Sequence, residues 1–169
     1  MYTAGIITVS DKGSRGERED VSGPVIKDKL TASGNRVAKY EIVPDEKEVI
    51  AAALAEWADT GEFDVILTTG GTGFAERDVT PEATRLVIDK SVPGFGEAMR
   101  MKSLEKTPMA MLSRATAGIR GKCLIINLPG SPKAVSECLD VILPAVAHGV
   151  EILKGEVTEH SVPDAGVNK

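Results

Sequence analysis

The sequence predicts an α/β fold in which a mostly parallel, mixed sheet carries helices on both faces. Strand patterns alternate with helix patterns over most of the chain, which is typical of a parallel sheet. The run DVILTT at 64–69 is rich in β-forming residues without alternation, as expected of a strand that is covered on both faces. Two strand patterns within 110–130 flank a turn near Arg120 and predict one hairpin, which makes the sheet mixed.

The first half of the chain predicts two strands, each followed by a helix. GIITVS at 5–10 is the first strand, and a polar loop leads to a helix that begins at Pro24. RVAKYEIV at 36–43 alternates like a half-buried strand. Asp45 is then placed to cap the next helix, with Glu48 completing a capping box. The apolar stripe expected of that helix consists of Val49, Ile50, Ala53, Leu54 and Trp57.

The second half predicts three more helices. The first begins after Thr80, a good N-cap, with Pro81 at its first position. The other two cover residues 93–106 and 132–154. Right-handed crossovers place the carboxyl ends of successive parallel strands along one edge of the sheet, where α/β proteins bind ligands.

Size and composition limit the classes of function that the chain can have. The 169 residues suffice for one well-buried core, and we predict a single domain over 1–157 with a polar tail over 158–169. The net charge of −5 argues against general nucleic-acid binding, which needs a basic face. No segment has the roughly 20 apolar residues of a membrane span, and the N-terminus lacks the basic region of a signal peptide. Cys123 and Cys138 lie in apolar runs, which favours reduced core cysteines and a cytoplasmic protein.

Four segments that directly follow predicted strands are expected to share the ligand-binding edge. They are Ser10-Asp11, Pro44-Asp45, the stretch from Gly70 to Asp78 and the stretch from Leu128 to Ser131. The third begins with the glycine-rich loop Gly70, Gly71, Thr72 and Gly73, which lacks the lysine of a P-loop. Missing Cβ atoms allow a ligand to approach, and consecutive amides can form an anion-binding nest. A tight turn alone also explains the glycines, but four polar segments at one edge favour a site.

Two acidic residues are candidates for the chemistry. Asp78 is not needed to cap the helix at Thr80, and an acid beside an anion site is repulsive unless a cation lies between them. Mg²⁺ supplies such a cation in phosphoryl chemistry, bound by carboxylate and substrate phosphate together. We therefore predict Asp78 as a metal-binding catalytic residue, with a surface ion pair to Arg77 or another basic residue as the alternative. Asp45 is predicted either as the second carboxylate of the site or as a helix cap only.

The remaining residues indicate the kind of reaction. Ser131 precedes the last helix, whose N-terminal amides suit phosphate, and Ser10 and Asp11 end the first strand at the same edge. His148 and His160 lie away from the strand ends, so a Ser-His-Asp arrangement is not supported. Nucleotidyl transfer to a phosphate fits this set. The attacking oxygen is already ionised, so the protein has mainly to align the groups and cancel charge.

Six stretches of the chain carry a resemblance to a known family: ITVSD, VPDE, TTGGTGFAERDVTPEAT, PGFGEAMR, MLSRATAGIRGK and LIINLPGSPKAV. In this order, from about Ile6 to Gly155, they resemble the molybdopterin adenylyltransferases of the MogA/MoaB type, which include the G domain of gephyrin. The sequence PMAMLSR is more similar to the MogA branch than to the MoaB branch. One departure is Glu76, because many members have proline before the Arg-Asp pair.

The resemblance implies a three-layer α/β/α fold, commonly a homotrimer, and a reaction in which ATP and molybdopterin give adenylyl-molybdopterin and pyrophosphate with Mg²⁺. It also implies a downstream enzyme that inserts molybdate or tungstate. In the family the aspartates that match Asp45 and Asp78 are essential, and the loop that matches Gly70 to Gly73 lines the nucleotide site. Further matches to the pterin and nucleotide cleft are Ser10, Asp11, Pro129, Gly130 and Ser131.

Other functions remain as alternatives. A molybdopterin-binding protein that does not adenylylate its ligand would have the same cleft. A scaffold, in which the trimer is the function, is disfavoured because this sequence contains no appended second domain. A dinucleotide-binding protein is also disfavoured, since VSDKGSRG after the first strand lacks the pattern G-x-G-x-x-G.

Overall fold

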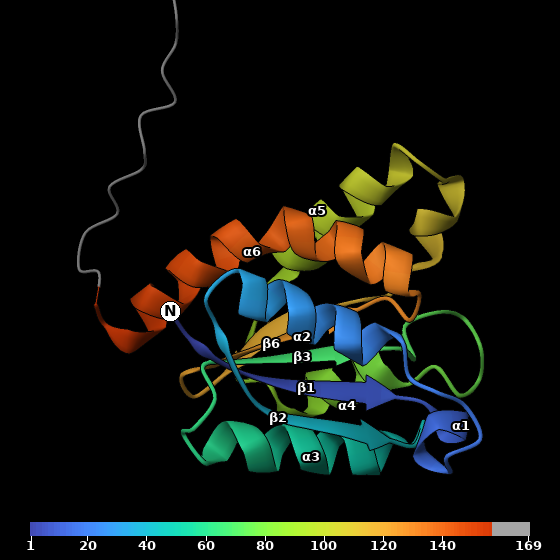
Figure 1. The fold of residues 1–169 in the computed structure, drawn as a ribbon, viewed down its shortest axis with the longest axis horizontal. Helices are drawn as coiled ribbons and strands as arrows, with labels where there is room; N and C mark the ends of the chain where they lie inside the picture. The colour runs from blue at the N-terminus through green and yellow to red at the C-terminus, as the bar shows by residue number, and fades with distance from the viewer. Residues whose placement is uncertain (157–169) are drawn as a thin grey trace, which may run out of the picture.

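A six-stranded sheet lies between two layers of helices (Figure 1). The structure is a computed structural model, and it describes residues 1–156. The strands are β1 (Thr3–Val9), β2 (Arg36–Val43), β3 (Val65–Thr69), β4 (Lys90–Ser91), β5 (Ala117–Arg120) and β6 (Cys123–Leu128). Their spatial order is β2-β1-β3-β6-β5-β4, in which β2, β1, β3 and β6 are parallel and the β5-β6 and β4-β5 pairs are antiparallel. The predicted mixed sheet and three-layer fold are confirmed.

The helices divide between the two faces of the sheet. They are α1 (Asp11–Ser14), α2 (Ser22–Ala32), α3 (Lys47–Asp59), α4 (Thr80–Val87), α5 (Pro93–Leu104), α6 (Pro132–Lys154) and the 3-10 helix η1 (Pro108–Leu112). Helices α2, α5 and α6 cover one face, and α3 and α4 cover the other (Figure 1). The predicted tail at 158–169 lies outside the described residues.

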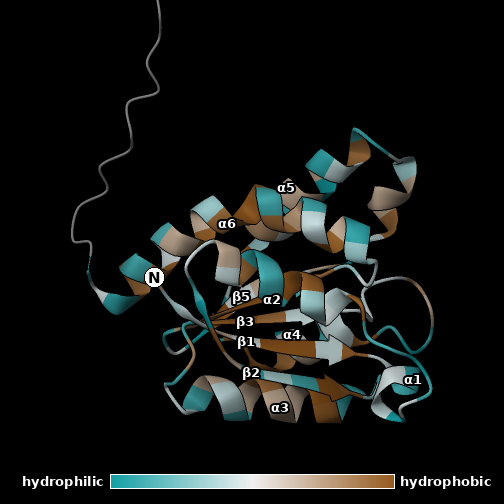
Figure 2. Cartoon of the chain, viewed as in Figure 1, coloured by the Kyte–Doolittle hydropathy of each residue, from teal (hydrophilic) through white to brown (hydrophobic). Residues whose placement is uncertain are grey.

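Alternating side chains of the central strands supply two separate cores. Ile6, Leu67 and Ile126 pack with α2, α5 and α6. Their neighbours Ile7 and Ile66 point the other way and pack with α3 and α4. Because successive strand residues face opposite sides, a strand buried on both faces is mostly apolar, as Figure 2 shows for the middle of β1 and β3. Toward their carboxyl ends the buried residues Thr8, Thr68 and Thr69 are polar. The interpretation of 64–69 as a doubly covered strand is confirmed.

Two expectations about burial need correction. The strand predicted at 36–43 is present, but most of its side chains are exposed rather than half-buried. The reason is that β2 lies at the edge of the sheet. In α3, Val49 is 38% exposed, and Ala58 is buried in its place.

Three predicted helix starts also differ. Helix α2 begins at Ser22, two residues before Pro24, because the Asp20 carboxylate accepts hydrogen bonds from the Ser22 and Gly23 amides. The capping box of Asp45 and Glu48 is wrong: α3 begins at Lys47, and no side chain caps it. Thr80 is the first residue of α4 rather than its cap, since its hydroxyl donates to the Gly70 carbonyl oxygen. Helices α1 and η1 and the short strand β4 were not predicted.

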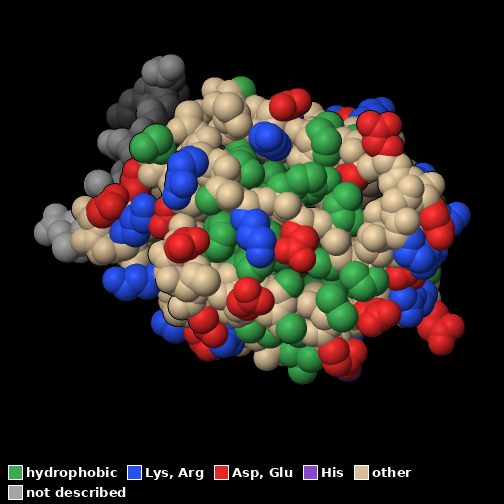
Figure 3. All heavy atoms as spheres, turned by 60° about the horizontal axis from the view of Figure 1, so that its bottom comes forward, with side chains coloured by type: hydrophobic (Ala, Val, Ile, Leu, Met, Phe, Trp, Pro, Cys, Tyr) green, Lys and Arg blue, Asp and Glu red, His purple; other side chains and the backbone are tan. Residues whose placement is uncertain are grey.

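The surface and the cysteines agree with the expectations from composition. Figure 3 shows acidic and basic side chains interspersed over the face that includes α3. Cys123 and Cys138 are buried and not disulfide-bonded. Within residues 1–156 no helix combines the length and apolarity needed to cross a membrane.

Candidate functional site

The carboxyl ends of β1, β2, β3 and β6 lie at one edge of the sheet, and the four polar segments meet there as predicted (Figure 1). Asp11 and Asp45 are joined across β1 and β2 by a reciprocal pair of hydrogen bonds. The Asp45 carboxylate accepts from the Asp11 amide at 2.7 Å, and the Asp11 carboxylate accepts from the Asp45 amide at 3.0 Å. Asp45 therefore links two strand ends and does not cap α3.

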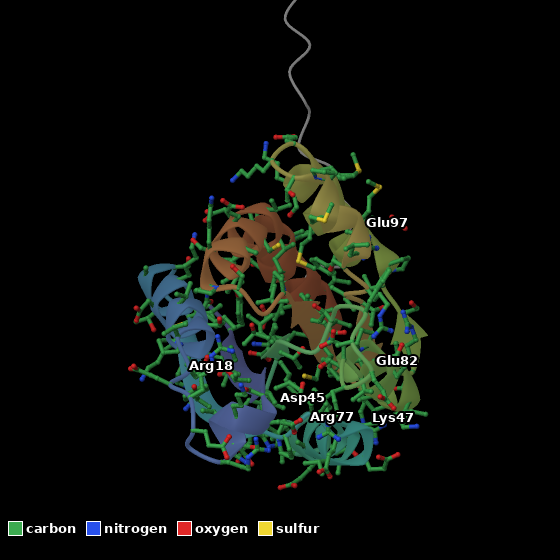
Figure 4. All side chains as sticks on the ribbon, turned by 90° about the vertical axis from the view of Figure 1, so that its right-hand side faces the viewer. Arg18, Asp45, Lys47, Arg77, Glu82 and Glu97 are labelled. Atoms are coloured by element: carbon green, nitrogen blue, oxygen red, sulfur yellow. The ribbon has the colours of Figure 1, made fainter. Side chains whose placement is uncertain are left out.

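Arg77 reaches back from the glycine-rich stretch to this pair. Its guanidinium donates two hydrogen bonds to the Asp11 carboxylate, at 2.9 and 2.7 Å. The Arg77 hydrogen bond is the main reason why the pKa of Asp11 is lowered. The alternative in which Arg77 pairs with Asp78 is wrong, because Arg77 is engaged by Asp11. Figure 4, which looks onto this edge, shows Arg77 next to Asp45.

The two predicted catalytic acids lie against the same loop. A Cβ added at Gly71 would lie 3.4 Å from the Asp45 Oδ1 atom, and one added at Gly73 would lie 2.8 Å from the Asp78 Oδ2 atom. The pKa of Asp45 is raised by burial and, further, by the charges of Asp11 and Asp78. The Asp78 carboxylate also accepts a hydrogen bond from the Ala75 amide at 2.9 Å.

The glycines are required by the turn as well as by the proximity of the acids. Gly70 and Gly71 have φ of 96° and 65°, a region that side-chain-bearing residues rarely adopt. Thr72, between these glycines and Gly73, is buried. Within the described residues, the amides of 71–73 donate to no other group, which leaves them available to an anion.

A polar hollow of about 400 Å³ lies beside Gly70. Four of the predicted binding residues line it: Ser10, Gly70, Gly130 and Ser131. The Ser131 hydroxyl accepts from the Ala134 amide and caps α6, as predicted, so a helix N-terminus opens into the hollow. The prediction had missed Arg18, which also lines the hollow and lies on the side of Asp45 away from α3 in Figure 4.

Asp20 is a second lining residue that the sequence interpretation missed. Its carboxylate accepts from the Thr8 hydroxyl at 2.6 Å, from the Tyr40 hydroxyl and from the Ser22 and Gly23 amides. Burial opposes ionisation of Asp20, but the hydrogen bonds from Thr8 and Tyr40 lower its pKa. Its spacing from Ser22 in the sequence is a capping signal that could have identified it.

A smaller, largely apolar hollow of about 210 Å³ lies on the other side of the 129–132 stretch. Pro129 lines this hollow and not the polar one. Met99, Met109 and Cys138 contribute apolar surface, and Arg100 lies at the same hollow. The predicted cleft segment 129–131 thus separates two neighbouring hollows.

Within residues 1–156, neither a histidine nor a pre-formed metal cluster contributes to this site. His148 is about half exposed and lies 3.6 Å from Glu151 on α6. His160 falls outside the described residues. No group of three or more His, Cys, Asp or Glu side chains within residues 1–156 is placed to hold a metal ion by itself.

Comparison with known proteins decides the family. Residues 5–148 match the family model described as "Probable molybdopterin binding domain". The chain belongs to this molybdopterin-binding family. The molybdopterin adenylyltransferase of Helicobacter pylori strain J99 is 48% identical over 153 residues, which cover 89% of this chain and 87% of that protein.

Solved structures of the molybdopterin-binding family share the fold. MoaB of Thermus thermophilus, a molybdopterin biosynthesis enzyme, has a TM-score of 0.86 and 52% identity, over 92% of this chain and 98% of that chain. A structure of MogA has a TM-score of 0.85 and 38% identity, over 89% of this chain and 99% of that chain. Both branch names occur among these neighbours, so the preference for the MogA branch stays a prediction.

Proposed function

We propose that this chain is a molybdopterin adenylyltransferase, which transfers AMP from ATP to the terminal phosphate of molybdopterin and releases pyrophosphate during molybdenum cofactor biosynthesis. The observation that carries the proposal is the convergence of Asp45 and Asp78 on one glycine loop beside a polar hollow. The likeness to the adenylyltransferase of Helicobacter pylori supports the same reaction.

The reaction exchanges one phosphorus–oxygen bond for another. An oxygen of the molybdopterin phosphate bonds to the α-phosphorus of ATP, and the bond from that phosphorus to the bridging oxygen of the β-phosphate breaks. Pyrophosphate takes the electron pair of the broken bond. Because the attacking oxygen is already ionised, the chain needs no histidine base and has mainly to align two polyanions.

The polar hollow is the place for the ATP phosphates in this proposal. The α6 N-terminus at Ser131 and the amides of 71–73 offer hydrogen-bond donors to phosphate oxygens. Ser10 and Gly130 line the same wall. Arg18 adds a positive charge to the lining. The apolar hollow beyond Pro129 suits a flat ring system, so in this proposal the two substrates bind on either side of one stretch.

Mg²⁺ is part of the proposal, with Asp45 and Asp78 as its protein ligands. Carboxylate oxygens are the ligands that Mg²⁺ combines with substrate phosphate. The residues fit a cation, because burial and, further, the charges of Asp11 and Asp78 raise the pKa of Asp45, and a positive charge relieves that repulsion. When bound, the metal neutralises charge on the phosphates. Asp11 is held by Arg77 and supports Asp45 through its amide.

Further parts of the proposal concern location and partners. We propose a cytoplasmic homotrimer that supplies adenylyl-molybdopterin to an enzyme inserting molybdate or tungstate. Helix α5 and the 3-10 helix η1 expose large apolar side chains, as a subunit contact would require. They are Met101, Met109, Met111 and Leu112. Light scattering during size-exclusion chromatography measures the mass directly, and a monomer over the working concentration range would contradict the trimer.

An assay of pyrophosphate release tests the function. The purified chain is incubated with ATP, Mg²⁺ and molybdopterin, and the product is identified by mass spectrometry. We expect pyrophosphate and adenylyl-molybdopterin in equal amounts, and neither when molybdopterin is omitted. Binding of molybdopterin without pyrophosphate release would instead identify a non-catalytic binding protein.

A further inference from the structure

Arg114 lies outside every residue that the sequence marked for the site, yet its side chain reaches the glycine-rich stretch. It follows η1 and is 31% exposed. Its Nε atom donates to the Gly73 carbonyl oxygen at 2.7 Å, and its Nη2 atom donates to the Asp78 carbonyl oxygen. Its Nη1 atom donates to the Glu82 carboxylate. One guanidinium therefore holds both ends of the segment 73–78.

The other half of the glycine loop has a separate anchor. The Thr80 amide donates to the Gly71 carbonyl oxygen at 3.1 Å, and the Thr80 hydroxyl donates to the Gly70 carbonyl oxygen at 2.9 Å. These bonds do not involve Arg114. Loss of the Arg114 side chain should therefore disturb 73–78 and leave the conformation of Gly70 and Gly71 in place.

Glu82 fixes the orientation of Arg114. Burial opposes ionisation of Glu82, but the hydrogen bond from Arg114 lowers its pKa and keeps the carboxylate charged. The guanidinium is a rigid planar fork, so binding Glu82 with one nitrogen sets the directions of the other two. These two nitrogens therefore point at the carbonyl oxygens of Gly73 and Asp78.

We propose that Arg114 is a positioning residue for the transfer reaction: it holds the segment 73–78 so that the Asp78 carboxylate faces Asp45 and the bound phosphates. The inference rests on the role of Asp78 in the proposed function. Within this segment the Asp78 carboxylate is further tied to the Ala75 amide, so the whole turn moves as a unit with its two ends. Arg114 acts on the reaction through Asp78.

Steady-state kinetics of Arg114→Gln provide the first test. We expect kcat to fall by about 100-fold, as for misplacement of a reacting group by about 1 Å, while KM for ATP changes less than about threefold. Arg114→Lys keeps the charge without the fork and should fall in between. Arg85→Ala is the matched control, since Arg85 pairs with the same Glu82 carboxylate from the exposed side and its loss should change kcat less than about twofold.

A double-mutant cycle separates positioning from a general structural effect. If Arg114 acts through Asp78, adding Arg114→Gln to Asp78→Asn lowers kcat by no more than about twofold further. If the two substitutions act independently, their separate losses in kcat multiply in the double variant, and that result would overturn the inference. Normal turnover by Asp78→Asn overturns both this inference and the proposed role of Asp78. Normal turnover by Arg114→Gln beside an inactive Asp78→Asn overturns only this inference.

Limited proteolysis gives a readout without catalysis. Arg77 lies within the segment 73–78 and is a tryptic site, so loosening the segment should speed cleavage after Arg77. We expect faster cleavage there in Arg114→Gln and Arg114→Lys, with unchanged rates at the other lysines and arginines that the variants share with the original chain. In Arg85→Ala the rate of cleavage after Arg77 should not change. Uniformly faster cleavage along the Arg114 variants would indicate general destabilisation and would overturn the inference.

Discussion

The two sides of the glycine loop present opposite chemistry to a ligand. On one side lie three carboxylates, Asp11, Asp45 and Asp78, of which, within residues 1–156, only Asp11 forms an ion pair, with Arg77. The burial and mutual repulsion there raise the pKa of Asp45. This acidic side repels phosphate on its own and is suited to a cation.

The hollow side of the loop combines uncharged hydrogen-bond donors with the charges of Arg18, Glu19 and Asp20. Two helices begin at the polar hollow, and they differ. The N-terminal amides of α2 are already occupied by the Asp20 carboxylate, whereas α6 is capped by the neutral hydroxyl of Ser131. Of these two helices, the α6 start is therefore the one free of a built-in anion. We therefore expect residues on the hollow side to determine how tightly ATP binds, and residues on the acidic side to determine the rate of turnover.

Asp78→Asn tests the acidic side most directly, and we expect it to lower kcat by about two to three orders of magnitude. Asparagine keeps an oxygen that can accept from the Ala75 amide, so the turn is retained while the charge is lost. Pyrophosphate release under saturating ATP measures the effect, and circular dichroism checks the fold. Near-normal turnover would remove Asp78 from the chemistry.

Asp45→Asn should lower kcat by about 100-fold. Asparagine can still accept from the Asp11 amide, and α3 has no side-chain cap to lose. The unfolding free energy should therefore change by less than the roughly 1 kcal/mol typical of a lost cap. Chemical denaturation measures this stability. If the unfolding free energy instead falls by about 1 kcal/mol and turnover stays normal, Asp45 has a structural role only.

These acids also show what could be predicted from the sequence. Parallel strands place their carboxyl ends at one edge, so Asp45 and the glycine loop were brought together correctly from strand order alone. Local capping rules misplaced Asp45 and Thr80, because both make stronger contacts with segments distant in the chain. Thr80 bonds to Gly70, ten residues earlier, and no local pattern encodes that bond.

The missed residues share a physical reason. Arg114 reaches Gly73 from 41 residues away, and its arginine type alone does not reveal a target. Arg18 belongs to a polar loop with no periodic pattern, so only the folded chain shows that it lines the hollow. Asp20 had a local capping signal, but the predicted helix start at Pro24 concealed it.

Arg18→Ala tests whether the hollow side determines ATP binding. If Arg18 binds ATP phosphates, its loss should raise KM for ATP by about tenfold, equivalent to about 1.4 kcal/mol, with kcat nearly unchanged. The effect should shrink in high salt, because exposed charges are screened. Initial-rate measurements at two salt concentrations check both points.

Arg15→Ala is the matched control for Arg18. Arg15 comes from the same loop and is exposed, but it pairs with Glu17 at 2.8 Å and does not line the hollow. Its loss should leave KM for ATP within about twofold of the original value. Equal effects of the two substitutions would mean that general charge, not a contact in the hollow, attracts ATP.

Glu76→Pro is expected to have the smallest effect and acts on the turn of the acidic side. The Asp78 amide donates to the Ala75 carbonyl oxygen at 2.9 Å, which makes Glu76 the second residue of a four-residue turn. Proline is favoured at that position, and Glu76 has a negative φ. The substitution should stabilise the protein by about 0.4–1 kcal/mol by restricting the unfolded chain.

The same substitution tests whether a rigid turn is sufficient for turnover. In the original background kcat should stay unchanged, since Arg114 already holds both ends of 73–78. In Arg114→Lys, whose turn is loosened, Glu76→Pro should recover part of the lost kcat and slow tryptic cleavage after Arg77. A stabilised protein with no recovery would mean that holding the turn in place is not sufficient and that turnover needs the hydrogen-bonding fork of the guanidinium itself.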